Sequence, residues 1–295
     1  MKTKGYALSI LSAVSYGLIP LFILPLKAGP LSLNSILFYR FFISALVIWG
    51  ALLYQKESLK VSRNELGLLI TLGLLFSLGA ECLFWSYDLL SPGIASTIFF
   101  VYPVIVSLIM AFFFKEPITR LTVILLCITM TGIWIISTKD SVFDINFWGL
   151  AISMVGSLCY AVYIVLINKA NIKASGLKLT FYTLLFSAAY YFLKVMLFER
   201  ALVIPEMETL VNITLFGLIT SVVSITALVY AVKEIGSTLT SIMGALEPVV
   251  AVGVSVSLFH EKLSYHLILG IVFILAGVTI NVIVGGSPEV ARDSA

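Results

Sequence analysis

Charged residues are scarce in this chain of 295 residues, since Asp, Glu, Lys and Arg together make up only 11% of it. A soluble protein carries roughly a quarter. Hydrophobic residues account for 60%, and the mean hydropathy is +1.11. So few charges cannot cover the surface of a globule of this size, which excludes a soluble protein and predicts an integral membrane protein. The net charge of +3 gives no support for a nucleic-acid partner.

Residues with reactive or metal-binding side chains are also scarce. The three cysteines, Cys82, Cys127 and Cys159, lie singly in apolar stretches, and the two histidines do not form an HExxH motif. The sequence contains neither a P-loop nor a GxSxG motif. We therefore expect no disulfide framework, no metal site, no cofactor and no catalytic residue, and we interpret the chain as a protein other than an enzyme.

Long apolar runs are what the chain does contain. A helix needs about 20 apolar residues to cross a bilayer core of about 30 Å. Polar residues, proline and glycine divide the chain into ten pieces of that length, which predicts an all-α membrane protein with ten transmembrane helices. The predicted spans are 5–26, 32–54, 66–88, 92–114, 120–138, 147–168, 178–198, 209–232, 237–258 and 264–284.

The positions of the basic residues predict the orientation, because cytoplasmic loops carry an excess of Lys and Arg. A cytoplasmic N-terminus places twelve of them inside and five outside, with Arg40 within a span. The inside set is Lys2, Lys4, Lys56, Lys60, Arg63, Lys115, Arg120, Lys169, Lys173, Lys178, Lys233 and Arg292; the outside set is Lys27, Lys139, Lys194, Arg200 and Lys262. This asymmetry predicts a multi-pass protein of the cell membrane with both termini in the cytoplasm.

An internal repeat appears when the chain is shifted against itself by about 145 positions. The matches keep their order along two segments, 1–140 and 141–286, which leave a cytoplasmic tail at 287–295. They pair Gly5 to Tyr16 with Gly149 to Tyr160, Phe38-Tyr39 with Phe181-Tyr182, Tyr102-Pro103 with Glu247-Pro248, Glu116 with Glu261, and Gly132 with Gly277. Five predicted spans are therefore repeated.

Because five is an odd number, the second repeat must enter the membrane in the opposite orientation. Two inverted repeats around a central site are the construction of many secondary transporters, in which the halves rock to expose the site to one side and then to the other. Membrane-embedded enzymes and channels can also contain repeats. Both stay open as alternatives, although the chain has no visible catalytic constellation and its central charged residues differ between the halves.

These features together resemble the EamA-type transporters of the drug/metabolite transporter superfamily. The resemblance covers nearly the whole chain and is carried by the two five-helix repeats, Arg40, Tyr102-Pro103, Leu246-Glu247-Pro248, Glu116, Glu261 and Gly277. It implies ten helices, a central cavity between the halves and alternating access. Branches of the family differ in their substrates, which are amino acids and their derivatives, other metabolites, or drugs. No pattern in this chain shows to which branch it belongs.

Three ionisable residues lie deep in predicted spans, where each costs at least about 2.5 kcal/mol to insert. Glu247 directly precedes Pro248, which we expect to leave the Gly244 carbonyl without its usual amide donor, so that carboxylate and freed carbonyl attract a cation or proton. The alternative is that Glu247 is neutral, is hydrogen bonded to a neighbouring helix and only stabilises the packing. Glu81, four residues from Trp85, either binds a substrate ammonium or pairs with Arg40. Arg40 is expected to act mainly as a brace. Lys194, nearer a span end, is expected to snorkel to the interface.

Aromatic residues and prolines complete the predicted site. If their helices face inward, Tyr16, Tyr102, Tyr160 and Trp85 line a central cavity, together with Tyr163, Phe99 and Tyr230. Pro103 and Pro248 lie at matching places in the fourth and ninth spans, where they suit either gates or static kinks. Glu116 and Glu261 are interpreted as solvated loop anchors. Gly132 and Gly277 predict close helix packing or a dimer seam.

The sequence therefore predicts a secondary transporter that moves a small organic metabolite, such as an amino acid, an amine or a related compound. Export by alternating access is the expected mode. The expected partners are this substrate and the lipid bilayer, with protons as the candidate coupling ion and a homodimer as the candidate assembly.

Overall fold

A computed structural model describes residues 2–27, 29–90, 98–137, 146–169, 174–258 and 265–285 of the chain. Within these residues every regular element is helical, as the long apolar runs predicted. The α-helices are α1 (Lys2–Gly17), α2 (Ile19–Lys27), α3 (Leu33–Tyr54), α4 (Arg63–Leu89), α6 (Tyr102–Phe114), α7 (Arg120–Ser137), α8 (Phe147–Lys169), α9 (Gly176–Lys194), α10 (Met207–Gly217), α11 (Ser224–Ile235), α12 (Ser237–Met243), α13 (Leu246–Leu258) and α14 (Tyr265–Gly285). Two π-helical segments, η2 (Val195–Glu199) and η3 (Leu218–Val223), extend α9 and join α10 to α11.

Seven of the described helical segments are long and apolar enough to cross a membrane, and three shorter ones are also apolar. The long segments are Thr3–Lys27, Leu33–Tyr54, Glu65–Ser86, Phe147–Lys169, Gly176–Glu199, Met207–Ile235 and Ser237–Leu258; the shorter ones are Tyr102–Phe114, Arg120–Ile135 and Ile268–Ile280. Each falls on one of the ten predicted spans. The chain is a multi-pass membrane protein, and ten crossings remain a prediction.

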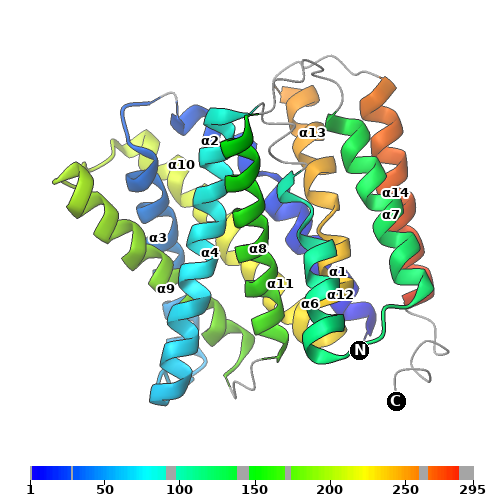
Figure 1. Ribbon diagram of the computed structural model, residues 1–295. Helices are drawn as coiled ribbons and strands as arrows, with labels where there is room; N and C mark the ends of the chain where they lie inside the picture. The colour runs from blue at the N-terminus through cyan, green and yellow to red at the C-terminus, as the bar shows by residue number, and fades with distance from the viewer. Residues whose placement is uncertain are drawn as a thin grey trace.

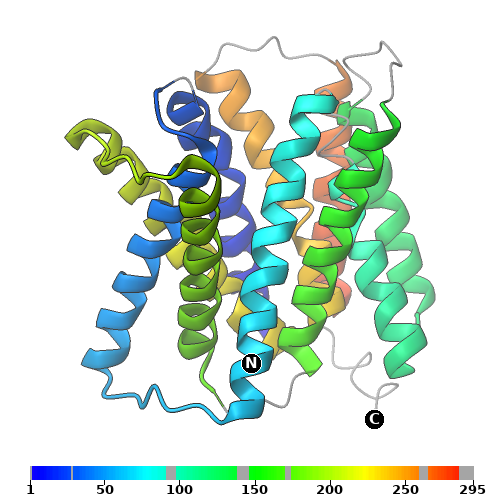
Figure 2. The same cartoon turned by 60° about the vertical axis from the view of Figure 1, so that its left-hand side comes forward.

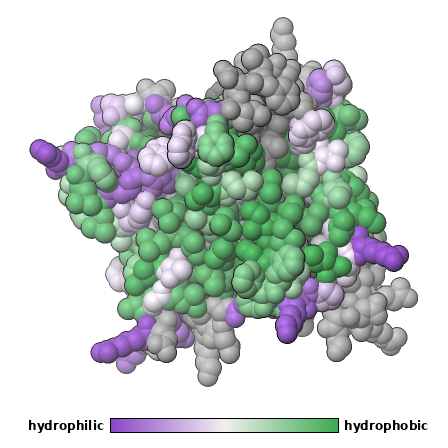
Figure 3. All heavy atoms as spheres, in the orientation of Figure 1, coloured by the Kyte–Doolittle hydropathy of each residue, from purple (hydrophilic) through white to green (hydrophobic). Residues whose placement is uncertain are grey.

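The surface has the polarity of a membrane protein. Hydrophobic residues form a broad band across the middle of the face in Figure 3, and most hydrophilic residues on it lie toward the two ends. Large apolar side chains such as Phe112, Phe113 and Leu197 are more than 70% exposed. Exposed apolar area on this scale needs a lipid environment.

The helices α3 and α9 lie side by side and run antiparallel (Figures 1 and 2). Ser32, the N-cap of α3, donates to the Glu199 carboxylate at the end of η2 (2.6 Å), and Ser175, the N-cap of α9, donates to Glu57 beyond the end of α3 (2.8 Å). Asn34 also donates to Glu199 (2.8 Å). Each end of the pair is therefore fastened by an N-cap serine and a carboxylate.

The helices α7 and α14 form a second close pair (Figure 1). A Cβ added to Gly132 would lie 2.7 Å from Ile274, and one added to Gly277 would lie 2.7 Å from Thr129. The predicted close helix contact at these two glycines is confirmed, and it is a contact within one chain. Because both glycines are covered by this pair, they do not supply the dimer seam that the sequence allowed.

The two ends of the described chain lie at the same end of the bundle. Figure 1 shows the start of α1 and the end of α14 both at the lower end of the view. This arrangement fits an even number of crossings. Which side of the membrane these ends face remains a prediction from the basic residues.

Candidate functional site

The ninth predicted span is interrupted where it carries its carboxylate. The helix α12 ends at Met243, Gly244 and Ala245 form a turn, and α13 begins at Leu246. Glu247 therefore lies in the first turn of α13, and Pro248 follows it. A proline is well tolerated there, because the first-turn amides of a helix have no partner within that helix.

The expected free carbonyl of Gly244 is not found. Pro248 cannot donate to the Gly244 carbonyl, but the Glu247 amide does so at 2.9 Å, so the expectation that this carbonyl is free was wrong. The turn at 244–245 shifts the hydrogen bonding by one residue and supplies a different amide. The Gly244 carbonyl is therefore satisfied within the turn, and the ionisable group at this break is the Glu247 side chain.

The fourth predicted span has a corresponding break. Residues 98–99 are helical, Phe100 and Val101 form a turn, and α6 begins at Tyr102, with Pro103 in its first turn. Residues 91–97 lie outside the described residues. The two matching dipeptides, Tyr102-Pro103 and Glu247-Pro248, thus each lie in the first turn of a new helix after a break.

Tyr102 and Glu247, which match each other in the repeat, are neighbours in space. The Tyr102 hydroxyl is hydrogen bonded to the Glu247 carboxyl. The tyrosine is 1% exposed and the glutamate 6% exposed. The ring fits there because Gly244 has no side chain, since a Cβ at Gly244 would overlap the Tyr102 hydroxyl.

Tyr160 of α8 lies at the centre of an aromatic cluster. Its ring meets the Tyr102 ring edge-on with centroids 4.9 Å apart, and it stacks on the Tyr16 ring at 6.4 Å. Phe99 and Tyr163 also contact it, at 5.8 and 6.0 Å. These five rings, all of them predicted to face inward, pack against one another in this structure.

Two aromatic residues of the predicted cavity lie elsewhere. Trp85 is 57% exposed on α4, and the ring of Tyr230 packs against Gly176 at the start of α9. Helical periodicity alone does not show which face of α4 or α11 points to the centre. The structure therefore brings Tyr16, Tyr102 and Tyr160 together with Glu247, and leaves Trp85 outside that group.

Arg40 lies in α3 and is 1% exposed. Its Nε donates to the Ser221 hydroxyl at 2.9 Å, and one terminal nitrogen donates to the Thr220 carbonyl at 3.3 Å, both within η3. The Tyr16 hydroxyl is also hydrogen bonded to it. The guanidinium carbon lies 4.1 Å from the centroid of the Phe216 ring, which adds a cation–π contact.

Glu81 pairs with a lysine and not with Arg40. Its carboxylate forms an ion pair with Lys194 at the end of α9, and it accepts a hydrogen bond from the Tyr190 hydroxyl. The suggested pairing of Glu81 with Arg40 is therefore wrong. The expected snorkelling of Lys194 is also wrong, because its side chain turns to a carboxylate within the bundle and is only 20% exposed.

Sequence reasoning missed the partners of these charged residues. Ser221 and Thr220 hold Arg40, while Tyr190 holds Glu81. Hydroxyl residues in an apolar span were the available signal, but such residues also bond to their own helix backbone, as Ser44 does with the Arg40 carbonyl. The sequence alone does not separate these two uses.

The glutamate at the end of α6 has a partner as well. Glu116 forms an ion pair with Lys169 of α8 at 2.6 Å, and both side chains are partly exposed. This contact ties the loop after α6 to the end of α8, which refines its interpretation as a solvated anchor. Its repeat counterpart Glu261 lies outside the described residues.

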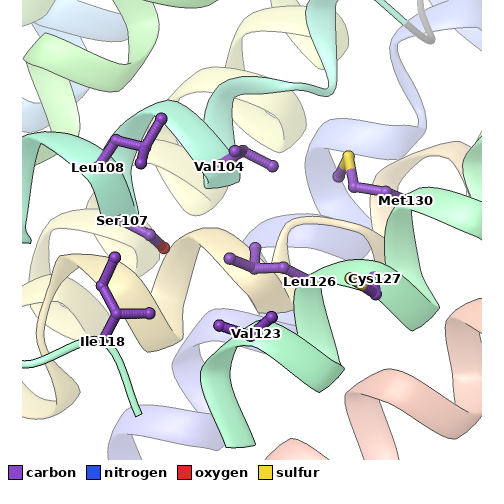
Figure 4. Close-up of a pocket in the computed structure, with 8 residues that line it drawn as sticks. All are labelled: Val104, Ser107, Leu108, Ile118, Val123, Leu126, Cys127 and Met130. Atoms are coloured by element: carbon purple, nitrogen blue, oxygen red, sulfur yellow. The ribbon is translucent and has the colours of Figure 1, made fainter. Parts of the chain in front are cut away.

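A groove between α6 and α7 has a volume of about 280 Å³ (Figure 4). Its lining is apolar apart from the Ser107 hydroxyl and the Cys127 thiol; the lining residues are Val104, Ser107, Leu108, Ile118, Val123, Leu126, Cys127 and Met130. A charged substrate would find no counter-charge there. Among the described residues no group of three or more His, Cys, Asp or Glu side chains is placed to hold a metal ion.

The described chain is thus a bundle of apolar helices with a polar, aromatic centre, which defines a multi-pass helical membrane protein. The sequence profile of the EamA-like transporter family matches residues 3–138 and again residues 147–283, and the chain belongs to this family of membrane transporters. The resemblance drawn from the sequence motifs is confirmed.

Two further similarities agree with this assignment. A Clostridium kluyveri protein named as an uncharacterized transporter is 22% identical over 295 residues, covering 94% of this chain and 93% of that protein. A solved crystal structure, described only as that of a protein, has the same fold, with a TM-score of 0.81 over 97% of this chain and 98% of the other at 16% identity.

Proposed function

We propose that this protein is a secondary transporter that exports a small organic metabolite bearing an ammonium group, such as an amino acid or an amine, in exchange for protons. The observation that carries the proposal is the placement of Glu247. It is buried at a helix break next to Tyr102, and among the described residues no Lys or Arg forms an ion pair with it. A carboxyl in this position is available to a proton or an ammonium.

The chemistry of exchange follows from burial. An isolated carboxylate is costly to place in a low-dielectric interior, so Glu247 holds a proton when no cation is bound. A substrate ammonium compensates the negative charge and allows the proton to leave. One carboxyl then binds proton and substrate in alternation, which is the requirement for exchange.

The arrangement of the helices supports alternating access between two inverted repeats. The helices α3 and α9 match in the sequence repeat and run antiparallel, as the caps at their ends require. The helices α7 and α14 also match in the sequence repeat, and the contacts of Gly132 and Gly277 show that they run antiparallel as well. Matched helices run antiparallel when two repeats are related by a twofold axis in the membrane plane. Two halves related in this way can exchange conformations.

We assign roles around Glu247 accordingly. Tyr102, Tyr160 and Tyr16 offer ring faces and hydroxyl groups to the substrate, and Arg40 positions Tyr16 and η3. The breaks that precede Pro103 and Pro248 are the positions where each span bends when the site opens. Since the rings pack against one another in this structure, opening must separate them to admit substrate.

The test is transport by purified protein in liposomes with a panel of amines and amino acids, with and without a pH gradient. Glu247→Gln keeps the shape of the side chain and removes its proton exchange. We expect the variant to fold and to lose accumulation driven by the gradient by at least roughly tenfold, which corresponds to about 1.4 kcal/mol.

Glu208→Gln, at an exposed glutamate in the first turn of α10, is the matched control and should transport normally. Accumulation by Glu247→Gln with the pH dependence of the native protein would show that this carboxyl does not couple transport. Transport of neutral and anionic compounds alone would refute the ammonium substrate.

A further inference from the structure

The ion pair between Glu81 and Lys194 has the composition of an ammonium-binding site. The Lys194 ammonium contacts the Glu81 carboxylate and lies 6.0 Å from the centroid of the Trp85 ring and 5.8 Å from that of Tyr190. The Tyr190 hydroxyl donates to the second carboxylate oxygen. A carboxylate beside two aromatic faces is a recurring way to bind an organic ammonium.

This site lies in the half of the bundle away from the chain ends. Glu81 stands eight residues before the end of α4 at Leu89, which is about 12 Å along the helix. Figure 1 shows that α4 ends on the side opposite to the start of α1. The Glu81 and Lys194 side chains are 12% and 20% exposed, so the pair is not sealed from its surroundings.

Lys194 sits where α9 gives way to the π-helical segment Val195–Glu199. Single turns of π-helix inside or at the end of an α-helix are unusual and occur often at functional sites. The lysine is thus attached to a helix end with irregular hydrogen bonding, from which its long side chain can withdraw. Glu81 and Trp85, one turn apart on α4, stay fixed.

We propose that Glu81, Tyr190 and Trp85 form a second ammonium site on the outward half of the transport path, and that Lys194 occupies it as a tethered substitute for a primary ammonium ligand. The inference rests on the proposed function for the identity of that ligand as a transported amine. When the substrate ammonium arrives, it takes the place of Lys194 on Glu81. When the substrate leaves, Lys194 returns to Glu81, so that the carboxylate is not left without an ion-pair partner.

The test removes the Lys194 ammonium by mutation and supplies an ammonium group again as a small amine in solution. Lys194→Ala removes three methylenes and the ammonium, which n-propylammonium supplies together. We expect 50 mM n-propylammonium to raise the unfolding temperature of this variant by roughly 2–4 °C and to leave the native protein unchanged, because its own lysine fills the site. The same concentration of n-propanol, which lacks the charge, should have no effect on either protein.

A second variant and a second ammonium source sharpen the test. The double variant Glu81→Gln/Lys194→Ala should show no response to n-propylammonium, because the carboxylate is gone. If the lysine variant is recovered folded only when the amine is present during purification, that rescue also supports the site. No stabilisation and no rescue by the amine, or an equal effect of n-propanol, would overturn it.

An ammonium can also come from a lipid headgroup, since Trp85 is 57% exposed. The Lys194→Ala protein is therefore compared in nanodiscs of phosphatidylcholine and of phosphatidylethanolamine. Stabilisation by n-propylammonium in phosphatidylcholine identifies a soluble ligand, whereas stabilisation only by phosphatidylethanolamine identifies the lipid. These measurements need no transport, so their outcome is independent of the Glu247→Gln experiment.

Discussion

Arg40 and Glu247 are two buried ionisable residues that the protein treats differently. Arg40 is surrounded by a hydroxyl, a carbonyl and aromatic rings, and no carboxylate of the described residues forms an ion pair with it. Each hydrogen bond from a charged donor to a buried neutral acceptor contributes about 1.5–3 kcal/mol. Glu247 has a single phenolic partner in Tyr102. The arginine is held by several partners, whereas the described contacts of the glutamate side chain give it one hydrogen bond.

The contact between Tyr102 and Glu247 depends on the absence of a side chain at Gly244. We expect Gly244→Ala to push the Tyr102 ring away from the carboxyl and to destabilise the protein by about 1–3 kcal/mol, the usual cost of overpacking a tight interior. The backbone at Gly244 is in the right-handed helical region, so an alanine is not strained by its own conformation. Thermal unfolding in detergent and proton-coupled uptake measure the two effects.

Two further variants identify the cause of such a loss. Gly253→Ala adds a methyl group to α13 with nothing within 4 Å and should be neutral. Tyr102→Phe in the Gly244→Ala background removes the overlapping oxygen and should recover part of the stability. If Gly244→Ala is as stable and active as Gly253→Ala, the close approach described here is wrong.

At the scale of helices, the breaks in the fourth and ninth spans matter more than the prolines that follow them. Pro103 and Pro248 each lie in the first turn of a helix, where the missing amide is not needed. Their effect is to prevent the preceding helix from continuing through the break. Two short helices joined by a turn can change their relative angle at less cost than one continuous helix.

We therefore expect Pro103→Ala and Pro248→Ala to insert and fold but to interconvert more slowly between conformations. A loss of roughly three- to tenfold in transport rate is expected, which corresponds to about 1 kcal/mol in the barrier. Spin labels on α6 and α13 would report a narrower range of distances. Pro205→Ala, in the loop before α10, is the control. Native rates in both helix variants would reduce the breaks to static bends.

The sequence predicts the positions of the helices well and their faces poorly. Apolar length alone placed every described span, because the bilayer fixes how many residues a helix needs. The π-helical segment Leu218–Val223 was not foreseen, because its composition is that of any apolar helix. The partner of Glu81 was not foreseen either, because Lys194 is 113 residues away and only helix packing brings the two together.

For the molecule as a whole, the largest helix contacts map onto one another when the two predicted repeats are exchanged. The pair α4 and α8 corresponds to α11 and α1, while α4 and α9 correspond to α10 and α3. The pairs α3 with α9 and α7 with α14 each correspond to themselves. Such a pattern is expected for two copies of one unit around a twofold axis.

Labelling from outside the cell tests the orientation of the two halves. In a protein without its native Cys82, Cys127 and Cys159, cysteines are introduced at turn and loop positions that are exposed or partly exposed. We expect those at 30 and 203 to react with an impermeant reagent in intact cells, because the basic residues place them outside. Those at 58 and 174 should react only after the membrane is opened. Equal reaction of all four would contradict the inverted arrangement.

The contacts between the halves also have a consequence for how the protein is made. The helices α3, α4, α6 and α7 of the first half have their main described neighbours in the second half. At about 5–20 residues per second, the ribosome needs roughly 7–25 s after α7 is complete to reach α14. During this interval the first five predicted spans must wait in the membrane with their packing faces against lipid or insertion machinery. A chain that stops early is therefore left unassembled and open to membrane proteases.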